Sequence, residues 1–162
     1  MPWFRRGPDP SLVSTVPDDE AADSPEALRG AIADVVRLVN ANAGRMPTAA
    51  VVNARRITDV LTEIVDTSRL RPLDVYAVIA VRGTVTDYLP TTLRGYLAID
   101  PALRDTPRAS GQTATQALLA QLDVLHTSTT ATLTAARHQD VDALMTQGGF
   151  LRTKFSRSDL DL

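Results

Sequence analysis

Apolar residues recur every three or four positions along most of this 162-residue chain, and that spacing leaves few folds open to it. The longest series comprises Ala114, Leu118, Leu122, Leu125, Thr129, Leu133 and Ala136. Such spacing places side chains on one face of an α-helix, which other elements must cover. Because aromatic residues make up only 4% of the chain, the core must be aliphatic, which favours packed helices over a β-sandwich.

Two earlier helices are predicted by start signals followed by apolar faces. Asp23-Ser24-Pro25-Glu26 is typical of a helix N-terminus, with a capping side chain, an early proline and an acid. The first helix is expected to run to about Asn42, and Pro47 can begin the second. Their apolar faces comprise Leu28, Ile32, Val35, Val36 and Val39, then Ala50, Ala54, Ile57, Leu61, Ile64 and Val65.

The segment after Pro72 permits two interpretations. Val75 to Val81 is rich in β-branched residues, which allows a buried strand. A helix is favoured because no other segment offers a strand for pairing and because one helical face accounts for the apolar residues Val75, Val78, Ile79, Val85 and Leu89. Pro90 is expected to kink or end this helix, since proline cannot donate a backbone hydrogen bond.

The last part of the chain predicts a connection over residues 100–111, a long helix over 112–137 and a separate final helix capped by Gln139-Asp140 and interrupted by Gly148-Gly149. Apolar residues of the final helix are Val141, Leu144, Met145, Leu151 and Phe155. The expected fold is all-α: an antiparallel bundle of four to five helices over residues 24–156. A proline-containing, disordered N-terminal tail over 1–23 and a loose C-terminus over 157–162 complete it.

The composition argues against several classes of function. The chain has no cysteine, so disulfides, thiolate nucleophiles and cysteine-ligated zinc are excluded. A formal net charge of -2 gives no basic excess for nucleic acid, and glycine-rich phosphate loops and the Gly-x-Ser-x-Gly elbow do not occur. The apolar run Val75–Val81 is far shorter than the ~20 residues of a transmembrane helix. Without a signal-peptide pattern, a cytoplasmic protein is expected.

The two histidines do not predict a metal centre. His126 and His138 are twelve residues apart on or beside one helix, too far to share a metal. A cation site at His138, Asp140 and Asp142 is the weaker alternative to ordinary helix-end roles, and an Asp123–His126 pair is a weaker alternative to a half-buried structural histidine. We therefore predict no catalytic residue, no metal and no cofactor.

Two features of the sequence are candidates for binding. Arg82 falls in the middle of the apolar face of the third helix, where it either pairs with an acid, extends its head to water or faces a cleft that accepts an anion. Arg94 would assist in the anion-binding case. At the N-terminus, Trp3-Phe4 beside Arg5-Arg6 could contact an anionic membrane surface or a partner groove, or belong to an ordinary terminus.

One segment resembles a known family. Asp87-Tyr88-Leu89-Pro90-Thr91-Thr92-Leu93-Arg94-Gly95-Tyr96-Leu97 is similar to a motif of bacterial XpaC-like proteins, named for bromo-chloroindolyl-phosphate hydrolysis and associated with toxic-anion resistance. The resemblance extends to the layout of the last half of the chain, and it carries over Tyr88, Leu89, Pro90, Thr92 and Leu93 as a motif or hinge. The membrane-associated N-terminal part expected of such proteins is lacking, and the final helix is less acidic.

The sequence thus favours a helical interaction or scaffold protein with a protein partner. That partner could be a second copy that completes the narrow Thr- and Ala-rich face of the long helix. By resemblance it would serve toxic-anion or stress resistance. One alternative is a phosphoester-hydrolysing or anion-binding enzyme that uses Arg82 and Arg94, with His126 or Asp87 moving protons. The other is recruitment to a membrane surface through Trp3 and Phe4.

Overall fold

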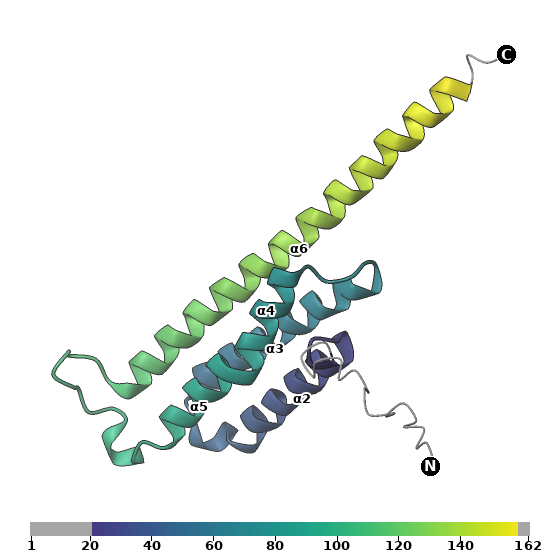
Figure 1. The fold of residues 1–162 in the computed structure, drawn as a ribbon. Coiled ribbons are helices and arrows are strands. Elements are labelled where there is room, and N and C mark those ends of the chain that lie inside the picture. The colour runs from purple at the N-terminus through teal and green to yellow at the C-terminus, as the bar shows by residue number, and fades with distance from the viewer. Residues whose placement is uncertain (1–20, 159–162) are drawn as a thin grey trace, which may run out of the picture.

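The computed structural model describes residues 21–158, and this part of the chain is all-helical, as predicted (Figure 1). Residues 1–20 and 159–162 lie outside the described part, as do the side chains of residues 143–144 and 147–158. Most of the predicted N-terminal tail and the predicted C-terminus therefore fall outside it. The strand alternative for residues 75–81 is wrong, because these residues are α-helical.

Four long rods make up the described structure. The chain order is α2 (Pro25–Ala41), α3 (Thr48–Asp66), α4 (Val75–Gly83), the π-helical segment η3 (Thr84–Tyr88), α5 (Leu89–Leu97) and α6 (Ala114–Ser158). Since α4, η3 and α5 follow one another without a gap, they form a single rod. Short 3-10 turns lie in the connections: η1 (Ala43–Arg45), η2 (Thr67–Arg69) and η4 (Pro101–Leu103).

The rods alternate in direction along the chain, but the spatial neighbours are not all antiparallel (Figure 1). At one end of the bundle Arg104 donates to the carbonyl oxygen of Arg45, three residues before α3, at 2.7 Å. The carbonyl oxygen of Arg104 in turn accepts from the Thr115 amide at the start of α6, at 3.2 Å. Towards the other end Arg137 of α6 pairs with Glu63 of α3 at 2.6 Å. The first contact joins the segments that lead into α3 and α6, and the second joins residues further along the same two helices. α3 and α6 therefore lie side by side and run in the same direction.

The core is aliphatic, and in α2, α3 and α6 it is built from the faces that the spacing predicted. Its fully buried members come from every rod: Leu28 and Val39 of α2, Ile57, Leu61, Ile64 and Val65 of α3, Val81 of α4, Leu89 and Leu93 of α5, and Leu122 of α6. The Thr- and Ala-rich face of α6 is also inside, because Thr129 and Ala136 are buried in the same chain. A second copy is therefore not needed to cover that face.

The rod of α4, η3 and α5 contains one residue more than a regular α-helix needs. The Leu89 amide donates to the Thr84 carbonyl oxygen, five residues back instead of four. Within α4 the buried positions are Val81 and Ala77, which precede Leu89 by eight and twelve residues. An uninterrupted α-helix would bury the positions about seven and eleven residues before Leu89. The π-turn has therefore rotated the inward face of α4 by about one residue, or ~100°.

This rotation corrects the predicted face of the third helix. Val81 is fully buried where a regular helix would have placed Arg82, and the Arg82 side chain is 42% exposed. Val75 and Ile79, which the spacing placed in the core, are 60% and 62% exposed. The prediction that Arg82 lies amid a buried apolar face is therefore wrong, and two of the residues expected around it, Val75 and Ile79, lie on an outer surface.

The π-turn lies where the sequence disfavours regular α-helix. Pro90 has no amide hydrogen, and in a regular helix its ring would crowd the carbonyl of Thr86. The hydroxyls of Thr84 and Thr86 donate to the carbonyl oxygens of Ala80 and Arg82, at 2.8 and 2.7 Å, a bond that bends helices. Pro90 was expected to kink or end this helix. The π-turn lies just before it, but the rod continues through Pro90 instead of ending there.

The final helix is not separate, and this corrects a second prediction. α6 runs unbroken over 45 residues, and Gln139-Asp140, read from sequence as a cap, lies in its interior. Both side chains instead bind Arg71, which precedes α4: Asp140 through an ion pair and Gln139 through a hydrogen bond of 3.1 Å. Arg71 also donates to the Ala136 carbonyl oxygen at 3.2 Å. The polar residues thus fix α6 to the bundle without ending the helix.

Candidate functional site

The outer face of α4 is an exposed apolar surface, which we name the α4 patch. It consists of Val75, Tyr76 and Ile79, which are 60%, 77% and 62% exposed. α4 has the sequence VYAVIAVRG and is apolar on nearly all sides. A helix of this kind is normally covered on every side, and contiguous exposed apolar surface marks interaction sites. The α4 patch is therefore the first candidate binding surface.

A second exposed surface lies on α6 beyond its contacts with the bundle. We name residues 141–158 the α6 arm, which at 1.5 Å per residue is about 27 Å long. Figure 1 shows α6 continuing past the ends of the other helices. Val141 and Met145 of the arm are 52% and 70% exposed, and their spacing of four places them on one face. The arm thus presents apolar side chains away from the bundle.

The α4 patch lies beside α6 just before the α6 arm begins. Tyr76 and Gln139 line the same small hollow of 130 Å³, together with Asp74, Ala77, Thr132, Ala135 and Ala136. Arg71 holds α6 at this point through Asp140, immediately before the arm begins. Val141 follows Gln139 by two residues, about 3 Å along the helix axis, and lies on a different side of α6. The patch and the start of the arm are therefore close together along α6 without forming one continuous surface.

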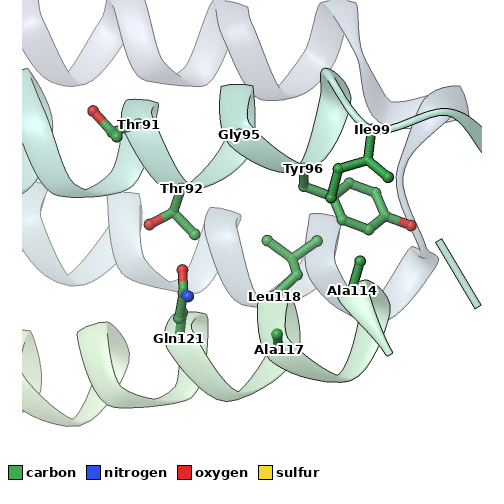
Figure 2. A pocket seen from close by; sticks show the side chains of 9 residues that line it. All are labelled: Thr91, Thr92, Gly95, Tyr96, Ile99, Ala114, Ala117, Leu118 and Gln121. Carbon is green, nitrogen blue, oxygen red and sulfur yellow. The ribbon is translucent and has the colours of Figure 1, made fainter. Parts of the chain in front are cut away.

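A groove runs between α5 and α6 (Figure 2). One part is a hollow of 280 Å³ lined by Thr91, Thr92, Gly95, Tyr96, Ile99, Ala114, Ala117, Leu118 and Gln121. The adjoining part is a hollow of 320 Å³ lined by Tyr88, Thr92, Ala120, Gln121, Val124 and Leu125. Because Thr92 and Gln121 line both hollows, we treat them as one α5–α6 groove; Figure 2 shows these two side chains facing each other from the two helices.

The groove has small residues in its walls and exposed apolar residues at its edge. A Cβ added at Gly95 would meet no atom within 4 Å, so its hollow has room for a further group. Tyr88 and Val124 at the edge are 60% and 68% exposed. The groove is therefore lined mainly by small and apolar side chains.

The residues of the family-like motif divide between the core and this groove. Leu89 and Leu93 are fully buried, and Pro90 is buried with them. Tyr88 and Thr92 instead line the groove. The three core residues have a packing role, so a binding role falls to the tyrosine and the threonine.

The two arginines proposed for anion binding are separated. Arg82 hydrogen-bonds Asp23 at 2.9 Å, so the first alternative, pairing with an acid, is the observed one. Arg94 is exposed and lines a different hollow of 260 Å³ between α2 and α5, which also contains Asp34. Twelve residues of helix separate the two by about 18 Å along the axis. They do not form a common site for one small anion.

Arg104 is a buried cation that the sequence did not single out. It is only 8% exposed, and it donates to the carbonyl oxygens of Leu97, Ile99 and Arg45 at 3.3, 3.1 and 2.7 Å. Its guanidinium carbon lies 4.7 Å from the centre of the Tyr96 ring. Two of the carbonyls lie at the C-terminal end of α5, so the arginine neutralises that helix end and joins it to the turn before α3. The proline- and glycine-containing connection around it gave no periodic signal.

The remaining candidate residues are not gathered into a metal site in the part of the chain that the structure describes. Among residues 21–158, no three His, Asp or Glu side chains are grouped as a metal site. Of the predicted cation ligands, Asp140 is bound to Arg71, and His138 and Asp142 are exposed. His126 is half-buried, as expected of a structural histidine.

Comparisons with known proteins give no relative from which a role could be transferred. No family model, no curated protein and no solved structure matches the chain. Within residues 21–158 no helix combines the length and apolar character needed to span a membrane. Trp3 and Phe4, the predicted membrane or partner contact, lie outside the described residues.

Proposed function

We propose that this protein is a helical interaction module that associates with a second copy of itself through the α4 patch and the α6 arm. The observation that carries the proposal is the exposure of α4, whose outer face is as apolar as a core face yet meets water. Burial of such a surface against a partner is the usual way in which it is stabilised.

The exposed area supports a second copy as the partner. Tyr76 exposes most of a side chain that can bury ~150–250 Å². The four aliphatic side chains of patch and arm add roughly 60–100 Å² each at the usual transfer energy per unit area. One copy thus offers on the order of 500 Å², and a symmetric pair about 1,000 Å², the lower limit for a specific interface.

The arrangement of the two surfaces also suits two-fold symmetry. In a symmetric dimer each surface of one copy meets the reciprocal surface of the other. Because the arm begins two residues beyond Gln139, which lines the same hollow as Tyr76, a two-fold axis near this point would lay each arm across the partner's patch. Both contacts then form together, and neither surface is left exposed.

Sedimentation analysis over a micromolar concentration series tests this proposal. The unaltered protein is expected to form dimers that dissociate on dilution, and Ile79→Glu or Met145→Glu is expected to leave it monomeric because each places a charge in the interface. Val52→Glu is the matched control, since Val52 is a 41% exposed valine on the outer face of α3. A monomer at every concentration, or equal dimerisation of all variants, would contradict the proposal.

The resemblance to XpaC-like proteins remains a separate prediction about the setting of this interaction. Under it, the module would act in a cytoplasmic toxic-anion or stress response in bacteria. Tyr88 and Thr92 then become the motif residues with a surface role, because both lie on the α5–α6 groove. Survival of a deletion strain in tellurite, with and without the restored protein, tests this prediction.

A further inference from the structure

We propose that the hollow between α2 and α5, which both Asp34 and Arg94 line, binds a small zwitterion of the α-amino acid type. The ligand's carboxylate lies at Arg94 and its ammonium group at Asp34. This inference is independent of self-association, because the hollow and the dimer surfaces consist of different residues. It rests on the placement of two opposite charges, on one carbonyl group of the π-turn, and on the size and lining of the hollow.

The two charges lie at about the same level on neighbouring helices. Asp23, just before α2, contacts Arg82 at 2.9 Å and so fixes the start of α2 against the rod of α4, η3 and α5. Asp34 follows Asp23 by eleven residues and Arg94 follows Arg82 by twelve, so both lie about 16–18 Å further along. They line one hollow, yet none of the ion pairs within residues 21–158 joins them. The hollow therefore separates two opposite charges.

Both charged groups retain capacity for a ligand. Arg37, one turn after Asp34, binds only the Oδ1 atom of that carboxylate, and a carboxylate can accept hydrogen bonds at both oxygens. Arg94 is exposed and belongs to none of the ion pairs of the described chain. A guanidinium group can donate two parallel bonds to a carboxylate. The pair can therefore hold both ends of a dipolar molecule.

The π-turn supplies a further acceptor beside the hollow. In a regular α-helix the Leu89 amide would donate to the Val85 carbonyl oxygen, but here it donates to that of Thr84. At the five-residue spacing of the π-turn the donor would be Pro90, which has no amide hydrogen. The Val85 carbonyl thus lacks the donors of both helix types, and Val85 and Pro90 line the hollow. An ammonium group has three hydrogens to donate, so it can serve this oxygen as well as Asp34.

The size and lining of the hollow select a small ligand with an aliphatic side chain. Its volume of 260 Å³ is just below the ~300–1,000 Å³ of pockets that hold drug-sized ligands. Apart from the polar groups, its walls are aliphatic and include Ala31, Val35 and Leu38 of α2. Leucine combines the two charges with such a side chain, and it is therefore the probe of choice.

Titration of the full chain with L-leucine, followed by the chemical shifts of its backbone amides, tests the proposal. Because both charged side chains are exposed, we expect a dissociation constant on the order of 1 mM. The shifted amides should be those around Asp34, Thr86 and Arg94. N-acetylleucine lacks the ammonium group and leucinamide lacks the carboxylate, so each should bind about three- to fivefold more weakly.

Two pairs of variants separate this site from general charge effects. Arg94→Gln and Asp34→Asn should each weaken leucine binding about three- to fivefold. Arg56→Gln and Asp59→Asn remove the same charges from exposed positions of α3 outside the hollow and should leave binding unchanged. The amide spectrum of each variant verifies that it is folded.

Three results would overturn the proposal. The first is the absence of shifts at tenfold the expected dissociation constant, or shifts only at amides away from the hollow. The second is an equal effect of the hollow variants and the α3 variants. The third is binding of N-acetylleucine as tight as that of leucine, which would make the hollow a site for simple anions.

Discussion

Replacing Arg104 by methionine should destabilise the protein far more than any other single loss of positive charge. The side chain is 8% exposed, and its removal leaves the carbonyl oxygens of Leu97, Ile99 and Arg45 without their donor. Each buried carbonyl left unpaired costs about 1–3 kcal/mol, part of which water recovers near a chain connection. The contact with the Tyr96 ring adds about 0.5–1 kcal/mol.

We therefore expect a loss of about 3 kcal/mol in the free energy of unfolding. For a chain of this size, that corresponds to a melting temperature lower by roughly 6–12 °C. Urea denaturation followed by helical circular dichroism measures the loss directly. The free energy of unfolding of Arg104→Lys should lie between those of the unaltered protein and Arg104→Met, because one ammonium group cannot reach three carbonyls in the way that the planar guanidinium does.

Arg108→Met provides the comparison, since Arg108 lies on the same connection and is exposed. It should change stability by less than about 0.5 kcal/mol. If Arg104→Met unfolds at the same urea concentration as the unaltered protein, the three hydrogen bonds contribute nothing net. The account of Arg104 as the residue that joins the α5 end to the turn before α3 would then be wrong.

Three further outcomes can be measured in the same way. Leu93→Ala should cost about 2–5 kcal/mol because Leu93 is fully buried, and a loss below 1 kcal/mol would show that the core around α5 is loosely packed. Gly95→Ala should raise stability by about 0.5–1 kcal/mol, since its Cβ meets open space; a decrease would mean that the glycine is needed by the fold. Arg71→Met should speed amide hydrogen exchange in α6 around Asp140 by removing the contacts that hold this part of the helix, and unchanged exchange would refute that role.

The sequence predicted the helical class and most of the core because aliphatic spacing records which face of a helix is buried. The faces of α2 and α3 were identified correctly: Leu28, Ile32, Ile57 and Leu61 are all buried. Ser24 was found within the predicted start, and its side chain accepts a hydrogen bond from the Ala27 amide at 3.1 Å. These features depend on local signals, which a single sequence contains.

The errors arose where a residue's role depends on distant parts of the chain. Gln139 and Asp140 have the residue types of a helix cap, and only the position of Arg71 shows that they are tertiary partners. Arg104 has no periodic context, so its three carbonyl acceptors could not be foreseen. The exposed α4 patch was missed because periodicity assumes an unbroken α-helix, and the π-turn violates that assumption.

The candidate site was only partly visible in the sequence. Tyr88 and Thr92 were selected as motif residues, and both line the α5–α6 groove. Their partners Gln121 and Val124 lie on α6, and nothing in their spacing indicates which other helix they face. A groove between two helices is a property of their packing, and one sequence does not record it.

The extra residue in η3 also determines how tolerance to substitution should vary along the rod. Within α4 and within α5, the positions most sensitive to substitution should be the buried ones, which are spaced four residues apart as in a regular helix. These are Ala77 and Val81 in α4 and Leu89 and Leu93 in α5. Between α4 and α5 the spacing of these positions should be one residue longer, because the segment Thr84–Tyr88 contains one residue more than a regular α-helix needs. A variant that lost one residue here would keep every side chain of α4 but rotate the helix by ~100°. Positions that are now solvent-exposed would then turn towards the core, and some that are now buried would turn towards water.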